Sequence, residues 1–349
     1  LDYEPPLAMP LPGPPPAGPS TAMARAAEWD TSMRACLEAG DLHSHGLIAK
    51  AVADDPDDLP ELWQRLSRKE PAYRRTLAGD LASMRDSTDL MALEMALTLI
   101  EPSARDQAVL ASISVQQQLD ALAKDMIIAD QEAFIIGAKV GGEQAGLATR
   151  AQHPVFNRIN PEAVTWAHLH VGTQIVGIGD ATLAGIRASV ATGLELGWHP
   201  RKLARLIRET IALTDRQAQA VTRFAERLAD DKPDLSDEKF FARVGRYGEA
   251  QRRLRPITIA RTELGEAASA GQQRLWDLAV EHGALRKDRL RKKWLATFDE
   301  LLEATCEGLA SEEVGIDEAF SNGQQGPPAH PSCRCAAGLV RAEDTVASL

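Results

Sequence analysis

The chain is poor in aromatic residues and in cysteine. Aromatic side chains make up 5% of its 349 residues, and four residues are cysteines. Strands are enriched in aromatic and β-branched side chains, so this composition favours a helical protein over a β-rich one. Four cysteines in a chain of this length are too few for the disulfide framework of a small secreted domain. We therefore expect the thiols to be free or metal-bound in a reducing compartment.

Long apolar runs and an excess of positive charge are also missing. No run approaches the roughly 18 apolar residues that a membrane span needs, and the N-terminal stretch lacks the basic region and apolar core of a signal peptide. We therefore expect no membrane contact. The formal net charge of −11 argues against a dedicated nucleic-acid binder, although it is compatible with a local basic patch.

The sequence also lacks common enzyme motifs. It contains no Gly-rich phosphate loop ending in Lys-Ser or Lys-Thr, no Gly-x-Ser-x-Gly nucleophile elbow and no His-Glu-x-x-His helix. Gly177 and Gly179 lie between predicted helices rather than after a strand, so they do not form a nucleotide fingerprint. These patterns predict a protein without a catalytic site or a cofactor.

What the sequence does contain is a strongly helical pattern that ends in short strands, which predicts a mainly α fold with a small α+β C-terminal cap. Eight prolines in residues 1–20 predict an extended, disordered arm. An N-terminal helical region of unknown role (residues 21–104), a helical domain (105–256), an α+β domain (257–340) and a tail (341–349) follow. Within the cap, we expect strands at residues 291–299, 314–320 and 335–340.

Helix signals are clearest between residues 115 and 283. A seam of period 3.5 predicts one long helix that packs through Val115, Leu119, Leu122, Met126, Ala129, Ala133, Ile136 and Val140. The seam could face another chain, but a partner helix in the same chain is the favoured interpretation. Capping residues and prolines predict further helix starts at Pro161, Asp180, Pro200, Thr214 and Ser236. Glycines predict stops at Gly197 and Gly283, and residues 237–254 and 257–282 are expected to form separate helices.

Four blocks in the second half of the chain occur in the order of a known family. A stretch beginning "NPEAVTW" is followed by "IARTE" opening a helix, by "KKWLATFD" and by "GPPAHPSCRC". Over about residues 155–340, this arrangement resembles the phage minor head protein family, the Mu F-type head-morphogenesis proteins. The family motif falls on Arg261, Thr262, Glu263, Trp294, Asp299, His330, Pro331, Cys333, Arg334 and Cys335.

The resemblance implies a structural minor capsid protein in the virion head of a phage or prophage, present in the host bacterial cytoplasm during assembly. Such a protein would associate with the portal, with scaffold or major capsid protein and with packaged DNA, and would assist head assembly or DNA ejection by binding rather than catalysis. Some relatives carry fused ADP-ribosyltransferases, but no such extra module is recognisable here. Two alternatives are a virion-delivered enzyme or effector that uses the Cys/His cluster, and a zinc-dependent nucleic-acid-binding module.

The chain departs from the family pattern in one segment. Where many members have a Cys-x-x-Cys pair after the aspartate, this chain has Glu303 and Cys306. Where they have Asp-Gly, it has Ala310 and Ser311. The sequence therefore supports neither a four-cysteine site nor a tight glycine turn at these positions.

Cys306, His330, Cys333 and Cys335 are the candidate metal ligands. Three sulfurs and one imidazole nitrogen suit tetrahedral Zn²⁺, but a Cys-x-Cys pair that enters a strand points its side chains to opposite faces. Glu303 is a weaker substitute, since a carboxylate is harder than a thiolate. The favoured interpretation is a brace: prolines stiffen the loop, His330 and Arg334 form hydrogen bonds, and buried thiols pack as small apolar groups. A redox pair activated by Arg334 is a third interpretation.

A basic stretch precedes the first strand. Six cations and one acid occur between residues 286 and 293, and the cations are Arg286, Lys287, Arg289, Arg291, Lys292 and Lys293. They are candidate contacts for packaged DNA or for an acidic face of another head protein. A solvated turn between helix and strand is the competing interpretation. We expect Trp294 to lie in the core, because a single aromatic residue does not make a row of stacking platforms.

Overall fold

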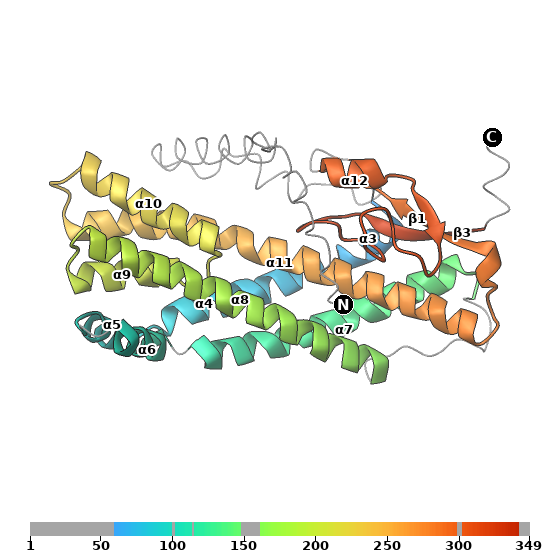
Figure 1. Cartoon of the computed structure of the whole chain (residues 1–349), viewed down its shortest axis with the longest axis horizontal. Helices are drawn as coiled ribbons and strands as arrows, with labels where there is room; N and C mark the ends of the chain where they lie inside the picture. The colour runs from blue at the N-terminus through green and yellow to red at the C-terminus, as the bar shows by residue number, and fades with distance from the viewer. Residues whose placement is uncertain (1–58, 100–101, 114, 148–160, 299–301, 342–349) are drawn as a thin grey trace, which may run out of the picture. The chain divides into compact units, whose positions relative to one another are not determined.

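The computed structural model describes residues 59–99, 102–113, 115–147, 161–298 and 302–341 (Figure 1). Helices dominate these residues and a small antiparallel sheet follows them, which confirms a mainly α fold with an α+β cap. The predicted Pro-rich arm, most of the region 21–104, Asp299 and nearly all of the tail lie outside the described residues. The described part of the region 21–104 consists of short helices, as expected.

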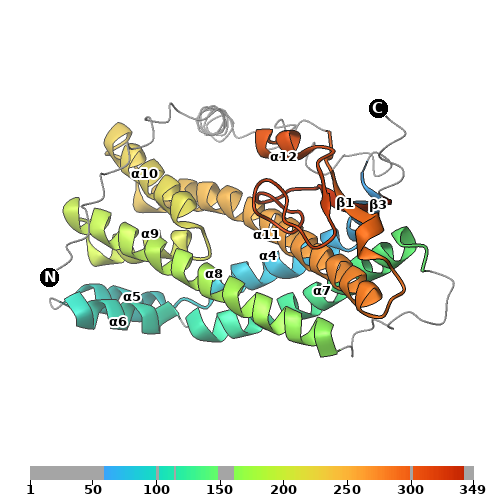
Figure 2. The same ribbon diagram turned by 45° about the vertical axis from the view of Figure 1, so that its right-hand side comes forward.

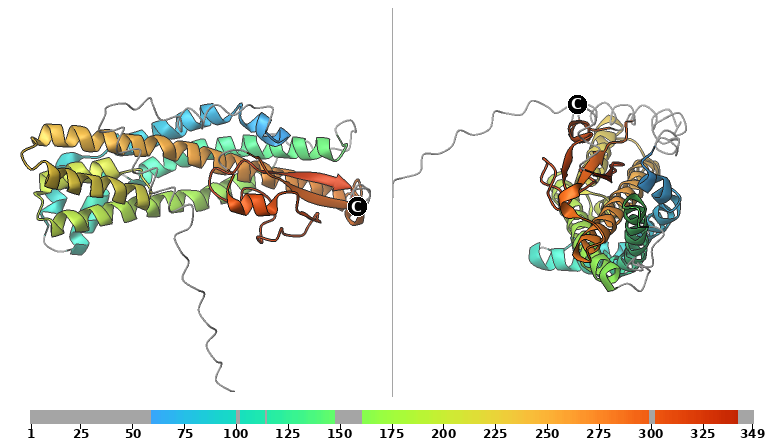
Figure 3. Two further views of the ribbon diagram at one scale, coloured as in Figure 1. Left: turned by 90° about the horizontal axis from the view of Figure 1, so that it is seen from above. Right: turned by 90° about the vertical axis from the view of Figure 1, so that its right-hand side faces the viewer.

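The helices pack as a bundle around two long members. Their bounds are α3 (Glu61–Leu66), α4 (Glu70–Asp86), α5 (Leu90–Leu97), α6 (Pro102–Ile113), α7 (Val115–Gln144), α8 (Pro161–Glu195), α9 (Pro200–Thr210), α10 (Asp215–Asp231) and α11 (Asp237–Glu281). Helix α7 packs against α11, α8 and α4, while α9 and α10 pack against α8 and α11 (Figure 3). The central position of α7 and α11 makes their contact the core of the bundle.

The predicted seam of α7 packs inside the chain, against α11. Leu122, Met126 and Val140 are fully buried, as the period of 3.5 requires. Two glycines bring the helix backbones into direct contact: a Cβ on Gly137 would lie 1.8 Å from the carbonyl oxygen of Ala268, and a Cβ on Gly271 would lie 1.9 Å from that of Phe134. The favoured intramolecular interpretation of the seam is therefore confirmed.

Local capping signals place several helix ends correctly. His199 accepts a hydrogen bond from the Arg201 amide ahead of Pro200, and Thr214 and Gln217 form the predicted capping box at α10. Helix α8 ends at Glu195 and the following Gly197 adopts a φ of +63°, a left-handed conformation that glycine tolerates without strain.

Two predicted helix boundaries are wrong. Helix α8 runs without a break through Asp180, whose exposed side chain does not cap a new helix. Helix α11 runs through Pro256, so residues 237–254 and 257–282 form one helix. Contacts on both sides of the proline favour continuity: the Arg252 guanidinium donates to the Glu209 carbonyl at 2.8 Å, and Arg261 donates to Glu70. The expected division between residues 256 and 257 therefore falls inside a helix.

The C-terminal cap contains a three-stranded antiparallel sheet beside the C-terminal half of α11 (Figure 2). Strand β1 (Leu290–Leu295) lies between β2 (Glu313–Gly315) and β3 (Ala336–Arg341). The strand expected at residues 314–320 stops at Gly315, because its amide turns to donate to the Glu318 carboxylate at 2.8 Å. A short helix, α12 (Ala304–Leu309), was not predicted.

Candidate metal centre in the cap

Three cysteines meet in the apolar core of the cap. Cys306 lies on α12, and Cys333 and Cys335 lie in the segment that leads into β3. Their exposed fractions are 0%, 2% and 4%, and all three are free thiols. They pack around Trp294 of β1 and against Phe320, so the expectation that Trp294 is a core residue is confirmed.

The sulfurs converge rather than diverge. The Cys306 and Cys333 sulfurs lie 3.5 Å apart, and the Cys335 amide donates to the Cys333 sulfur at 3.5 Å. The Cys335 thiol interacts with both of the other thiols. The expected opposite orientation of Cys333 and Cys335 is wrong, because the pair lies in a turn that begins at Ser332 (φ +63°) and precedes β3.

His330 completes the cluster from the proline-rich loop. One of its ring nitrogens lies within 4.8 Å of the Cys306 and Cys333 sulfurs. Its Nδ1 lies 3.0 Å from the Pro331 carbonyl oxygen and 3.4 Å from Glu303 Oε1, and contacts of this kind orient the imidazole of a metal-binding histidine. Glu303 thus contacts His330 and orients its ring. In the sequence analysis Glu303 was considered as a substitute metal ligand, which is a different role.

The thiols do not share their protons equally. Hydrogen bonds from Cys306 and Cys333 to the Cys335 sulfur lower the pKa of Cys335, whereas the hydrogen bonds to Cys333 and Cys335 raise the pKa of Cys306. One thiolate is therefore stabilised inside the cluster by its neighbours. A thiolate is the form of cysteine that binds a metal ion.

Cys306, His330 and Cys333 lie close enough together to be three ligands of a tetrahedral Zn²⁺ site. Zinc–sulfur bonds of about 2.3 Å place the sulfurs of one site about 3.8 Å apart, close to the observed Cys306–Cys333 separation. Cys335, which is not part of the 4.8 Å group, is the candidate for the fourth corner. The full burial of the thiols argues against a catalytic nucleophile, which requires access to a substrate.

Three consecutive motif residues on α11 join three parts of the molecule. Arg261 Nε donates to Glu70 Oε1 of α4 at 3.0 Å. The Thr262 hydroxyl oxygen accepts a hydrogen bond from the Ser332 amide of the cap at 3.1 Å. Glu263 Oε2 lies 2.8 Å from Nε2 of His170 on α8. Elsewhere in the motif, Arg334 is buried and Pro331 is exposed.

The basic stretch is only partly available to a partner. Lys292 is fully buried and donates to the carbonyl and side-chain oxygens of Gln325 at 2.8 Å, so its assignment as a contact residue is wrong. The cause is strand alternation, which turns Lys292 and Trp294 inward and Arg291 and Lys293 toward the other face. Arg286, Lys287 and Arg289 are exposed, and the first two pair with Asp288 and Asp317.

Sequence reasoning missed a second cluster. Asp130 of α7 and His170 of α8 meet Glu263 of α11 inside the bundle. The available signal was weak: Asp130 interrupts the apolar stretch "MIIADQEAFII", and His170 lies in a helix rich in small and apolar residues. Such interruptions reveal a site only when the packing of the helices is known.

Comparison with known proteins gives one partial similarity. The chain is 32% identical over 90 residues to the NAD(+)–arginine ADP-ribosyltransferase EFV of Enterococcus faecalis. That match covers 25% of this chain and 18% of the length of the transferase. No family model matches the chain, and no solved structure is similar to it. In the described part of the chain, every helix is too short or too polar to cross a membrane.

Proposed function

We propose that the chain is a structural minor head protein of a phage or prophage, which binds the portal and assists head assembly or DNA ejection. The proposal is supported by the ordered motif blocks and, above all, by what the motif residues contact. Arg261, Thr262 and Glu263 each bind another part of the same chain, and the Cys/His segment closes the cap. Motif residues engaged in internal contacts favour a structural role over a catalytic one.

Exposed apolar side chains on α8 provide a candidate surface for the portal or another head protein. Leu169 and Val176 are 71% and 61% exposed, and their separation of seven residues places them on one face of the helix. Large exposed apolar groups that recur on one face are typical of interaction surfaces. Arg286, Lys287 and Arg289 in the cap are the remaining candidates for contact with packaged DNA.

Co-expression with the portal protein of the same genome tests this function. Native mass spectrometry of the purified portal ring is expected to show discrete added copies of this chain. Leu169→Asp combined with Val176→Asp should remove those copies without changing the melting temperature, because both side chains are exposed. A portal ring without added copies, next to free wild-type chain, would contradict the proposed association.

We further propose that Zn²⁺ closes the cap through Cys306, His330, Cys333 and Cys335. Elemental analysis of chain purified from zinc-supplemented cells is expected to give one zinc bound at this cluster. Cys333→Ser should lose this zinc and lower the melting temperature, whereas Cys36→Ser should retain it. Zinc content that is unchanged by Cys333→Ser would instead leave the cluster as a brace of hydrogen bonds and packed thiols.

The partial match to a transferase supports one rival function, an effector that transfers ADP-ribose to arginine. Incubating the chain with labelled NAD⁺ and a small guanidine acceptor measures this activity directly. Transfer above the level of a heat-denatured control would support the rival. Its absence, together with copies on the portal ring, would support the structural function.

A further inference from the structure

The centre of the bundle holds a second set of ligand-type side chains, remote in sequence from the cap. Asp130 of α7, His170 of α8 and Glu263 of α11 present atoms that all lie within 4.8 Å of one another. Glu266, one turn further along α11, adds a carboxylate: His170 Nε2 lies 2.8 Å from Glu263 Oε2 and 3.3 Å from Glu266 Oε2. Three helices therefore converge on one imidazole and three carboxyl groups.

Asp130 has no visible reason to be buried here. It is 0% exposed, and neither of its carboxyl oxygens has a hydrogen-bond partner among the described residues. A buried carboxylate without a hydrogen-bond partner or a counter-ion destabilises the folded state. Protonation would remove the charge but would leave the new hydroxyl group equally without an acceptor. A cation between the carboxyl groups satisfies both oxygens at once.

We propose that Asp130, His170 and Glu263, with Glu266 beside the histidine, bind a divalent first-row metal ion of the Mn²⁺ or Fe²⁺ type. Oxygen donors with a single imidazole favour these ions over the softer ones that thiolates select. Metal–ligand bonds of about 2.1 Å place neighbouring ligand atoms about 3 Å apart and opposite ones about 4.2 Å apart. The observed separations of 2.8 Å and 3.3 Å match neighbouring positions.

The surroundings support a preformed site. The Trp166 ring stacks on His170 with centroids 4.4 Å apart and an interplanar angle of 14°, which fixes the imidazole plane. Inward-facing carboxylates and a histidine from several helices are a known way for a helix bundle to hold a metal ion. The positive charge of the ion would also offset the mutual repulsion of these buried carboxyl groups.

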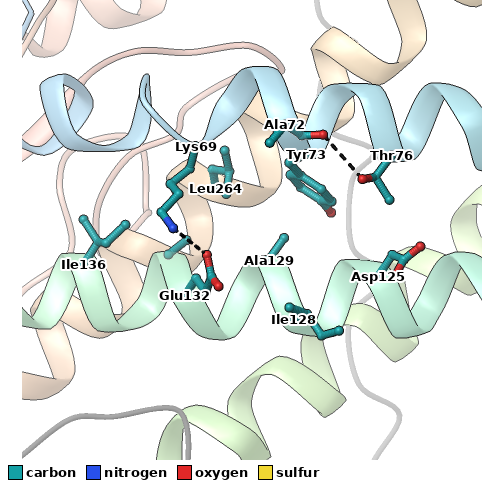
Figure 4. A pocket seen from close by; sticks show the side chains of 11 residues that line it. Lys69, Ala72, Tyr73, Thr76, Asp125, Ile128, Ala129, Glu132, Ile136 and Leu264 are labelled. Atoms are coloured by element: carbon teal, nitrogen blue, oxygen red, sulfur yellow. Dashed lines mark hydrogen bonds and ion pairs between the residues drawn. The ribbon is translucent and has the colours of Figure 1, made fainter.

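A pocket lies next to the cluster, because Ala129 and Leu264, the chain neighbours of Asp130 and Glu263, line it. This pocket of about 230 Å³ lies between α4 and α7 and is lined among others by Tyr73, Asp125 and Leu264 (Figure 4). Figure 4 shows the Tyr73 side chain reaching from α4 toward α7, and its buried hydroxyl group has no partner among the described residues. Burial and then the charges of Asp130 and Glu263 raise the pKa of Tyr73.

Titration of the zinc-loaded chain with Mn²⁺, followed by the loss of the electron paramagnetic resonance signal of free Mn²⁺, tests the site. We expect one Mn²⁺ per chain, and a loss of affinity of about tenfold or more for Asp130→Asn and for His170→Gln. Glu132 lies on α7 like Asp130 and lines the pocket, but it is outside the cluster. The variant Glu132→Gln should therefore bind Mn²⁺ like the wild type. Cys333→Ser should also retain Mn²⁺, because it affects only the cap.

Asp130→Asn preserves side-chain shape and removes a buried charge, so the variant should fold, and circular dichroism checks this. Mn²⁺ should raise the melting temperature of the wild-type chain but not that of Asp130→Asn. The proposal is overturned if the wild type binds no Mn²⁺ up to about 1 mM, an affinity too weak to matter. It is equally overturned if folded Asp130→Asn binds Mn²⁺ as tightly as the wild type. Neither result depends on whether the chain binds a portal.

Discussion

Replacing Gly137 or Gly271 by alanine is expected to break the contact between α7 and α11. At these positions a Cβ would lie 1.8 Å and 1.9 Å from backbone oxygens of the facing helix. Ordinary contact begins near 3.4 Å, so the two backbones would have to separate by about 1.5 Å. Neither oxygen belongs to a side chain that could rotate away. We estimate a loss of about 3 kcal/mol in the free energy of unfolding for each substitution, the upper part of the range for overpacking.

Gly79→Ala is the matched control, because a Cβ at this exposed position of α4 meets nothing within 4 Å. Its higher helix propensity should stabilise the chain by about 0.5–1 kcal/mol. Urea unfolding, monitored by circular dichroism, gives the free energy of unfolding of the three variants. The data are fitted with one common dependence of this free energy on urea concentration. The reasoning would be refuted if Gly137→Ala lost less than about 0.5 kcal/mol, a change typical of a surface substitution. A change in oligomeric mass without loss of stability would instead assign the α7 seam to a contact between chains.

Three further outcomes follow from the same contacts. Ser311 has a φ of +66° at the position where the family has glycine, so Ser311→Gly should stabilise the chain by about 1 kcal/mol in thermal unfolding, whereas Ser311→Ala should not stabilise it. Burial, followed by the charge of Asp125, raises the pKa of Asp80 to about 6. The folded state therefore favours the protonated acid, and the free energy of unfolding falls as pH rises from about 4 through 6. Asp80→Asn should raise the free energy of unfolding by up to about 1 kcal/mol at pH 7.5, after allowance for solvent screening. The same substitution should have no effect at pH 4. Lys292→Ala should leave the Gln325 oxygens unpaired and lower the free energy of unfolding by about 2 kcal/mol, seen as a lower melting temperature, without changing DNA binding. The control, Lys293→Ala, should change stability little. Equal effects of the two substitutions on the melting temperature would contradict the inward orientation of Lys292.

Signals that act over three or four residues were sufficient to place several helix ends. Thr214 and Gln217 satisfy each other across one turn, and the glycines after α8 and α11 adopt left-handed conformations next to the last turn. The energies involved are local, so the sequence carries them without knowledge of the fold. The fold class followed in the same way from the change of period at the C-terminal end.

The wrong predictions share a different cause. Asp180 has the chemistry of a cap and Pro256 that of a helix breaker, but packing on both sides of each residue keeps the helix continuous. Lys292 has the charge of a surface residue, but the β1 register turns it inward, where Gln273 and Gln325 receive its ammonium group. In each case a tertiary contact outweighs a local preference of about 1–3 kcal/mol.

The same distinction separates the two candidate metal sites. The ligands of the cap lie within 30 residues of one another, so spacing and the family resemblance brought Cys306, His330 and the Cys-x-Cys pair into one hypothesis. The proposed ligands in the bundle are far apart in the sequence: His170 and Glu263 are separated by 93 residues. A single polar residue on an apolar helix face does not indicate a site. It does so only when the folded structure shows that polar residues from three helices meet at one place. Glu263 connects the two kinds of evidence: its sequence context identified it as part of a motif, and its packing against Asp130 and His170 places it in the proposed metal site.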